Sequence, residues 1–353
     1  MFVVVDIENF LRSSKTFHQS RELAAEGADL LVSQMASFAA PLVAASTGIP
    51  WASVVLQPLG FFSAFDPVPL FDQSSPSGVR ELDLATHRRL LNLNRQAWYS
   101  WAWPVRQFRA ELGLPPGRNP VYEDHHSRDL VLALFSKTLG PVQPDWPVQT
   151  QITGFAFLDT GKGEVAVPPG LQEFLAGGVP PIIFTLASQS AADTSGFFWK
   201  SIQAAALLGR RAVLIGKGTP AILAAAKLHP AVAANIVAFD YASYSAIFPH
   251  AAMIVHHGGI GTLAAALRAG QPMIVVPLTH EQLHAALRVV KLGCARVISG
   301  SHYTAASGAG EIARVLGDQR FARAALAVQQ GIAAEDGVTS ACAALEAFVV
   351  RAA

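Results

Sequence analysis

The sequence predicts an α/β protein with two domains, each built on a parallel sheet. The chain has 353 residues, of which 51% are hydrophobic and 14% are charged, and this is enough to bury two separate cores. The second observation is a recurring unit in which a short apolar run leads through a turn into a helical segment. Residues 252–255 and 273–277 have the continuous apolar character of buried parallel strands, and the helices that follow them end at Gly270 and Gly293.

The first half of the chain alternates in the same way. We expect a strand at residues 29–33, a helix from about 38 to 46 and a second strand at 51–56. Residues 30–65 carry no charged side chain, a length that would also suit a membrane span. Because the turn at residues 48–50 divides the stretch, a buried α/β arrangement is favoured over a span.

Residues 82–112 are expected to be helical, divided by Pro104. One interpretation makes this segment the wall of an apolar binding site or a membrane-surface contact, because aromatic rings with one wet edge suit both. The other, which is favoured, is a helix packed on the sheet with its arginines in water. The residues concerned are Trp98, Tyr99, Trp101, Trp103 and Phe108, among Arg88, Arg89, Arg95, Arg106 and Arg109.

A glycine turn after the 252–255 strand predicts a phosphate site. The first N–H groups of a helix have no internal partner and lie at the positive end of its dipole, so an anion binds there without a lysine. Gly259 and Gly261 allow close approach of the backbone, Thr262 can cap the helix or donate its hydroxyl, and His257 can donate to a leaving diphosphate. The alternative is a turn that serves only strand–helix packing.

A polar pair follows the next strand. Glu281 and Gln282 lie at the carboxyl end of a parallel strand, one connection away from the glycine turn, where open α/β sheets bind ligands. A carboxylate accepts from two neighbouring hydroxyls, and an amide both donates and accepts, so the pair suits a hexose. Taken alone, the pair reads more simply as first-turn residues that start a helix.

Residues 236–298 resemble the donor-binding signature of the GT-B nucleotide-sugar glycosyltransferases, the group that includes bacterial natural-product, sterol and rhamnosyl transferases. The family pattern H-x-G-x-G-T is matched by His257, Gly259, Gly261 and Thr262, and its D-Q pair by Glu281-Gln282 with an acid one methylene longer. The resemblance implies two Rossmann-like domains and transfer of a sugar from a nucleoside diphosphate to an acceptor hydroxyl.

The resemblance also implies donor contacts and domain limits. It places the base near Tyr241 and Ala242, the diphosphate at Gly261 and Thr262, and a further phosphate contact at Ser188, with Ala187 in place of the usual glycine. The domains expected are an acceptor-binding domain at 1–160, a donor-binding domain at 176–338, and a C-terminal helix at 339–353 that crosses back onto the first domain.

The resemblance implies that the first domain is incomplete at its N-terminus. In the family, a glycine-rich loop after the opening strand carries the histidine that deprotonates the acceptor, and residues 1–10 have no such loop. About 70 to 100 residues are expected to be absent, since each βαβ step needs roughly 30 residues. Gln34 occupies the position of the aspartate that orients this histidine, and His18 is a poor substitute for the base. No catalytic residue is therefore assigned.

Composition excludes other classes. A net charge of +1 gives no general case for nucleic acid. Two cysteines, Cys294 and Cys342, supply neither a disulfide framework nor a zinc site, so a cytoplasmic protein is expected. Residues 123–126 (Glu-Asp-His-His) invite a metal hypothesis, but consecutive side chains point in different directions and a solvated loop is favoured.

The function expected is therefore transfer of a hexose from a UDP- or dTDP-sugar to a hydroxyl of an apolar small molecule or lipid, such as a sterol or a polyketide-like compound. The reaction is expected to be inverting and to need no metal or other cofactor. Peripheral contact with a membrane is an additional possibility. Two alternatives stay open: a truncated, catalytically silent donor-binding protein, and a sugar-nucleotide epimerase on the same fold.

Overall fold

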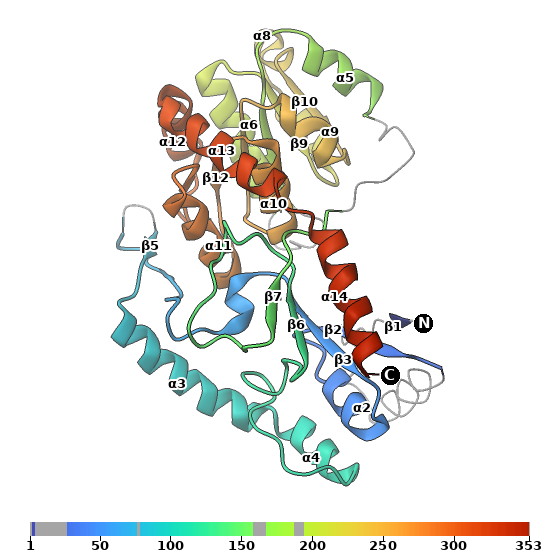
Figure 1. Ribbon diagram of the computed structural model, residues 1–353. Coiled ribbons are helices and arrows are strands. Elements are labelled where there is room, and N and C mark those ends of the chain that lie inside the picture. The colour runs from blue at the N-terminus through green and yellow to red at the C-terminus, as the bar shows by residue number, and fades with distance from the viewer. Residues whose placement is uncertain (1, 4–26, 76–77, 158–166, 187–193, 353) are drawn as a thin grey trace. The chain divides into compact units, whose positions relative to one another are not determined.

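The computed structural model describes residues 2–3, 27–75, 78–157, 167–186 and 194–352 (Figure 1). Contacts divide the chain into two compact units. The first unit comprises residues 1–67, 82–157 and 335–353, and the second comprises residues 68–81 and 158–334. The segment 68–81 thus lies in the second unit, although the expected boundary at residue 160 places it in the first domain.

The first unit contains a parallel sheet whose strands follow the order β1-β2-β3-β6-β7. The central strands are formed by alternating apolar runs and turns, as expected, and β2 and β3 lie within one residue of their predicted limits. That this sheet is incomplete stays a prediction, and His18 lies outside the described residues. The strands are β1 (Phe2–Val3), β2 (Leu30–Gln34), β3 (Trp51–Val55), β6 (Leu130–Ala133) and β7 (Thr150–Ile152).

Helices pack on both faces of this sheet, because neighbouring residues of a strand point to opposite sides. Leu31 packs with α2 (Ala40–Thr47), which has a proline in its first turn and ends at Gly48 in the left-handed conformation, with φ of 76°. Leu30 packs instead with Phe348 of the C-terminal helix α14 (Gly337–Ala352). The short 3-10 helix η2 (Pro58–Phe61) follows β3.

The arginine-rich segment forms two helices, α3 (Leu84–Trp101) and α4 (Trp103–Glu111). Asp83 caps α3 by accepting from the backbone N–H of Thr86 at 2.9 Å. The favoured expectation of a helix packed on the sheet is right for α4, whose Val105 and Phe108 join the α2 core. It is wrong for the end of α3, where residues 92–101 are all exposed.

The second unit contains a six-stranded parallel sheet with the order β10-β9-β8-β11-β12-β13. The strand order reverses between β8 and β11, and open α/β sheets bind ligands at such a reversal. The strands are β8 (Ile182–Thr185), β9 (Ala212–Ile215), β10 (Ile236–Phe239), β11 (Met253–His256), β12 (Met273–Val275) and β13 (Ala295–Val297).

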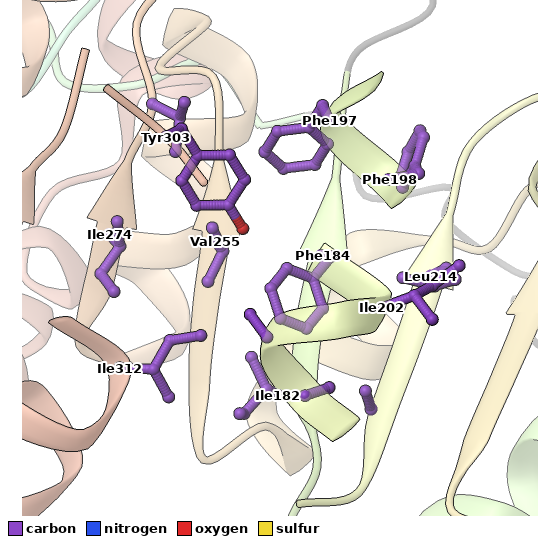
Figure 2. Close-up of a cluster of buried hydrophobic side chains, with 14 of the residues drawn as sticks. Ile182, Phe184, Phe197, Phe198, Ile202, Leu214, Val255, Ile274, Tyr303 and Ile312 are labelled. Atoms are coloured by element: carbon purple, nitrogen blue, oxygen red, sulfur yellow. The ribbon is translucent and has the colours of Figure 1, made fainter. Parts of the chain in front are cut away.

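Figure 2 shows the main core of this unit, in which Phe184 and Val255 of adjacent strands meet Ile202 and Ile312 from the covering helices. Tyr303 is buried in the same core. Its hydroxyl group has a hydrogen-bond partner there, Ser201 Oγ at 2.9 Å. The helices are α5 (Pro169–Ala176), α6 (Thr194–Leu208), α7 (Thr219–Ala225), α8 (Pro230–Ala233), α9 (Tyr244–Ile247), η3 (Phe248–His250), α10 (Ile260–Ala269), α11 (His280–Lys291), α12 (Ala305–Gly317) and α13 (Gln319–Ala333).

A small antiparallel hairpin completes the second unit. Its strands are β4 (Leu70–Phe71) and β5 (Val79–Arg80). Across the part of the chain that the structure describes, no helix combines the length and apolar character that crossing a membrane requires.

Candidate functional site

The turn between β11 and α10 has the geometry of a phosphate cradle. Gly258 adopts a φ of 94°, which favours glycine, and a Cβ there would lie 2.7 Å from Val275 Cγ1 and 3.1 Å from the backbone oxygen of Gln282. Gly259 is the N-cap of α10. The first N–H groups of α10 therefore follow directly from a turn that is packed against the start of α11.

Gly261 is the open side of this cradle. It is exposed, and a Cβ built on it meets nothing within 4 Å. Thr262 is buried, with 4% of its surface exposed, and it does not cap the helix because Gly259 is the N-cap. The space beside Gly261 is therefore where a ligand can approach the helix N-terminus.

His257 lies against the same turn and is 4% exposed. A Cβ on Gly259 would lie 2.6 Å from His257 Nε2, so the imidazole edge is directed at the cradle. Burial lowers the pKa of His257 below its ordinary value. The side chain is therefore a neutral imidazole at physiological pH and can act as a hydrogen-bond donor without a full charge.

His256, to which no role was assigned from the sequence, supports the turn from within the core. It is completely buried, and its Nδ1 accepts from the backbone N–H of Gly258 at 3.1 Å while its Nε2 lies 3.5 Å from Met273 Sδ. Burial, together with the neighbouring His257, lowers the pKa of His256 to about 3. The only signal for it in the sequence is its place beside His257 at the strand end.

The start of α11 presents the polar pair. Thr279 is the N-cap and accepts from the Gln282 N–H at 3.3 Å, while Gln282 Oε1 accepts from the Leu278 N–H at 2.8 Å. The helix-starting interpretation is therefore correct for the Oε1 atom of Gln282, which is used to bond the backbone before the helix. Its NH₂ group is the part that can donate to a ligand, and Glu281 beside it is exposed in the first turn, where the helix dipole favours an anion.

The structure brings the cradle and the polar pair together. β11 and β12 are neighbours, with His256 opposite Val275, and the close approach of Gly258 to Gln282 joins the turn to α11. Both features lie at the carboxyl ends of adjacent strands on one side of the reversal in strand order.

The residues expected near the base follow β10 at the same sheet edge. Tyr241 is 76% exposed, so its ring is available for stacking, whereas Ala242 is buried. The loop is held by Asp240, whose Oδ1 accepts from the Gly218 N–H at 2.6 Å. Ser188, the remaining donor residue expected, lies outside the described residues.

A second feature missed by sequence reasoning lies at the end of β8. Thr185 is fully buried, and its Oγ1 donates to the Ile215 carbonyl at 2.9 Å and bonds the Tyr244 hydroxyl at 2.8 Å. Tyr244 in turn stacks on Phe248, with ring centroids 4.4 Å apart. This network ties the loop after β10 to the strand at which the order reverses.

The first unit contains an apolar cavity at the carboxyl end of β2, with a volume of about 290 Å³. It includes Trp98 and Trp101 of α3, whose rings meet edge to face at 4.9 Å. Its lining is almost entirely aromatic and aliphatic, which suits a small hydrophobic ligand. The lining residues are Met35, Ala36, Phe38, Phe62, Trp98, Trp101, Val121 and Tyr122.

The loop at 123–126 differs from expectation. Glu123 pairs with Arg95 and Asp124 with Arg118, but His125 and His126 are buried, at 2% and 8% exposure, so the loop is not fully solvated. Burial lowers the pKa of His125 to about 4 and that of His126 to about 2. Over the described ranges, no three His, Cys, Asp or Glu side chains gather as a metal site would require.

The two units with parallel sheets have the GT-B fold, and comparison with solved structures shows this. The chain matches the glycosyltransferase VinC in complex with dTDP with a TM-score of 0.69 and 20% identity, over 97% of this chain and 77% of that one. It matches the spinosyn forosaminyltransferase SpnP with a TM-score of 0.69 and 16% identity, over 96% and 81%. The expected GT-B fold is confirmed.

Sequence comparisons define the family. Residues 222–348 match the family described as Erythromycin biosynthesis protein CIII-like, C-terminal domain. The chain is 32% identical over 333 residues to the O-mycaminosyltylonolide 6-deoxyallosyltransferase of Streptomyces fradiae, covering 92% of this chain and 74% of the relative. It is 28% identical to the vancomycin aglycone glucosyltransferase of Amycolatopsis orientalis, covering 85% and 70%. The chain belongs to the natural-product glycosyltransferases.

Proposed function

We propose that the protein transfers a hexose from a dTDP- or UDP-sugar to a hydroxyl of an apolar natural product or lipid, with inversion at the anomeric carbon and without a metal ion. The observation that carries the proposal is the junction between Gly258 and Gln282. It sets an open helix N-terminus beside a polar helix start, as a diphosphate with an attached sugar requires.

The donor would lie along the sheet edge of the second unit. Tyr241 stacks on the base next to the buried Ala242, the N–H groups beside Gly261 hold the diphosphate, and Glu281 and Gln282 hold sugar hydroxyls. By the family resemblance, Ser188 adds a phosphate contact. A dTDP complex is known for VinC, which supports a thymidine or uridine diphosphate here.

In this reaction the donor site must stabilise the leaving diphosphate. Helix-terminal N–H groups act on the developing charge without reorganising, and the neutral His257 adds a donor at the cradle. This combination replaces the charge of a metal ion. No residue is assigned as the general base.

The acceptor would occupy the apolar cavity lined by Trp98, Trp101 and Tyr122. Flat aromatic walls favour a rigid hydrophobic aglycone. The names of two relatives specify an O-mycaminosyltylonolide and a vancomycin aglycone as acceptors, which supports a natural-product acceptor.

The test is an acceptor screen with dTDP-glucose and UDP-glucose, with and without a chelator, followed by assignment of the anomeric configuration of any product. Transfer that survives chelation and inverts the configuration supports the proposal. Retention, or loss of transfer on chelation, contradicts the mechanism. Donor binding with no transfer to any acceptor favours a silent donor-binding protein, and interconversion of the free sugar nucleotide favours an epimerase.

A further inference from the structure

Residues 68–81 leave one unit and pack on the other. The chain belongs to the first unit up to Pro67 and again from Leu82, but the hairpin between them is part of the second unit. Figure 1 shows β5 beside α11. A two-stranded hairpin with strands of two residues has little stability alone, so its contacts with α11 hold it in place.

These contacts run from the first residue of α11 to the last. Phe71 meets His280 edge to face, with ring centroids 5.1 Å apart. Val79, which is 9% exposed, packs in one buried cluster with Leu283 and Leu287 of the helix. At the end of the segment, Glu81 pairs with Lys291 at 2.8 Å, an exposed pair that adds little stability.

Gly78, the residue before β5, is fitted to the loop after β13. Gly78 has a φ of 72°, and a Cβ there would lie 2.0 Å from Ser299 Oγ, so only glycine fits. The residue after Ser299 joins this loop to the segment before α11, because the Gly300 N–H donates to the Pro277 carbonyl at 3.3 Å. The hairpin therefore contacts α11 and the loop after β13, and this loop is itself bonded to the segment that leads into α11.

We propose that this hairpin is a positioning element for the donor sugar, which rests on the proposed role of Glu281 and Gln282. His280, which Phe71 contacts, immediately precedes Glu281, so the hairpin fixes the direction in which the first turn of α11 presents its polar pair. The phosphate cradle touches α11 at Gln282, but it also has a support of its own, the hydrogen bond from the Gly258 N–H to His256. The hairpin therefore acts mainly on recognition of the sugar, and recognition of the diphosphate changes much less.

The experiment compares binding of dTDP-glucose with dTDP, and of UDP-glucose with UDP, by calorimetry on the full chain. We expect Phe71→Ala to weaken binding of the sugar nucleotide by about two- to tenfold, the range of one aromatic pair, and to affect the bare diphosphate much less. Phe71→Tyr, which keeps the aromatic ring, should bind the sugar nucleotide as the wild type does. Leu207→Ala, on a side chain of α6 that is 67% exposed, is the control and should change neither ligand.

A double-mutant cycle asks whether Phe71 acts through the polar pair. If it does, Phe71→Ala combined with Glu281→Ala loses less affinity for the sugar nucleotide than the sum of the single losses. Additive losses would overturn the hairpin's role. Should Phe71→Ala fail to fold, the same contact can be tested from the helix side. His280→Ala should then weaken binding of the sugar nucleotide, and His280→Phe, which keeps a ring, should not.

The outcomes separate the two proposals. A sugar-dependent loss in Glu281→Ala with none in Phe71→Ala overturns the inference about the hairpin and leaves the donor site intact. No sugar-dependent loss in either variant, or no binding of either sugar nucleotide, overturns the proposed donor site itself. Equal weakening of dTDP and dTDP-glucose by Phe71→Ala shows a general disturbance of the unit and also overturns the hairpin's role.

Discussion

The backbone N–H of Gly258 donates to Nδ1 of His256 at 3.1 Å. An Nδ1 that accepts carries no proton, so the proton of this neutral imidazole is on Nε2, directed at Met273 Sδ. The bond ends at Gly258, the residue of the turn where φ is 94°. The shape of the phosphate turn therefore depends on a buried histidine that must stay uncharged.

The first prediction concerns acid. The folded-state pKa of His256 is about 3, below the ordinary 6.5, so its contribution to stability is complete above pH 6.5 and is lost as the pH falls below that value. The free energy of unfolding should fall by up to about 1.4 kcal/mol per pH unit for this group. Denaturant titrations between about pH 7 and pH 5 should show a shallower fall for His256→Gln than for the wild type.

His125 and His126 add to the same acid dependence, with pKa values of about 4 and 2. The control for His256→Gln is His250→Gln, on an exposed histidine of the same unit. An identical pH slope in His256→Gln and the wild type would show that His256 is not buried as a neutral group.

The second prediction concerns the phosphate cradle. Gly261→Val should weaken dTDP and UDP binding by more than about tenfold, because its side chain fills the open space at the helix N-terminus. Stability should not fall, since valine has a better helix propensity than glycine. Calorimetry and circular dichroism measure the two properties.

Gly310→Val is the matched control for the cradle. Gly310 is also an exposed helical glycine with nothing within 4 Å of a built Cβ, but it lies in α12. The Gly310→Val variant should bind dTDP and UDP as tightly as the wild type does. Unchanged affinity in Gly261→Val would place the diphosphate elsewhere.

The third prediction concerns the sugar clamp. Gln282→Glu keeps the oxygen that accepts from Leu278 but loses the NH₂ donor, so it removes a ligand contact and preserves the helix start. We expect Glu281→Ala to weaken binding of the intact sugar nucleotide by about 1 to 3 kcal/mol and to leave the bare diphosphate nearly unchanged. Gln282→Glu should weaken the sugar nucleotide more than the bare diphosphate, which loses some affinity because the new negative charge lies beside the cradle. Equal losses for both ligands would contradict this assignment.

The fourth prediction concerns the acceptor. Trp98→Ala and Trp101→Ala should each remove about 1.5 to 3 kcal/mol of acceptor binding, which is about tenfold or more in KM for the acceptor, with KM for the donor unchanged. Trp199→Ala is the control, because Trp199 is as exposed as Trp98, at 40% against 41%, but does not line the cavity. Steady-state kinetics with each substrate varied separates the effects. A matching rise in KM for the acceptor in Trp199→Ala would count against the cavity.

Local patterns account for what the sequence predicts well. The apolar runs, glycine turns and helix ends around β11, α10, β12 and α11 lie next to one another in the chain, so the glycine turn and the helix start at Glu281-Gln282 could be placed on the fold from the sequence. Their role in donor binding came from the family resemblance and stays a prediction. The contacts that shape the site are different in kind. Thr185 with Tyr244, and His256 with Met273, join residues far apart in sequence, and no periodicity indicates them.

The hairpin shows the same limit. Strands of two residues produce no measurable alternation, and the assignment of 68–81 to the second unit depends on the side chains of α11 more than 200 residues later. Burial of His125 and His126 was also missed, because a run of Glu-Asp-His-His reads as polar. Its neighbour Phe61, which stacks on His126 at 5.3 Å, lies in a different segment.

The hairpin at 68–81 bears on how these enzymes can be recombined. A chimera that joins the first half of one homologue to the donor half of another at a single linker would pair α11 with a foreign Phe71 and Val79. The sugar preference of such a hybrid would then reflect a mismatched contact as well as the grafted donor site. An exchange that carries residues 68–81 along with the donor half, as a two-segment graft, keeps the native pairing.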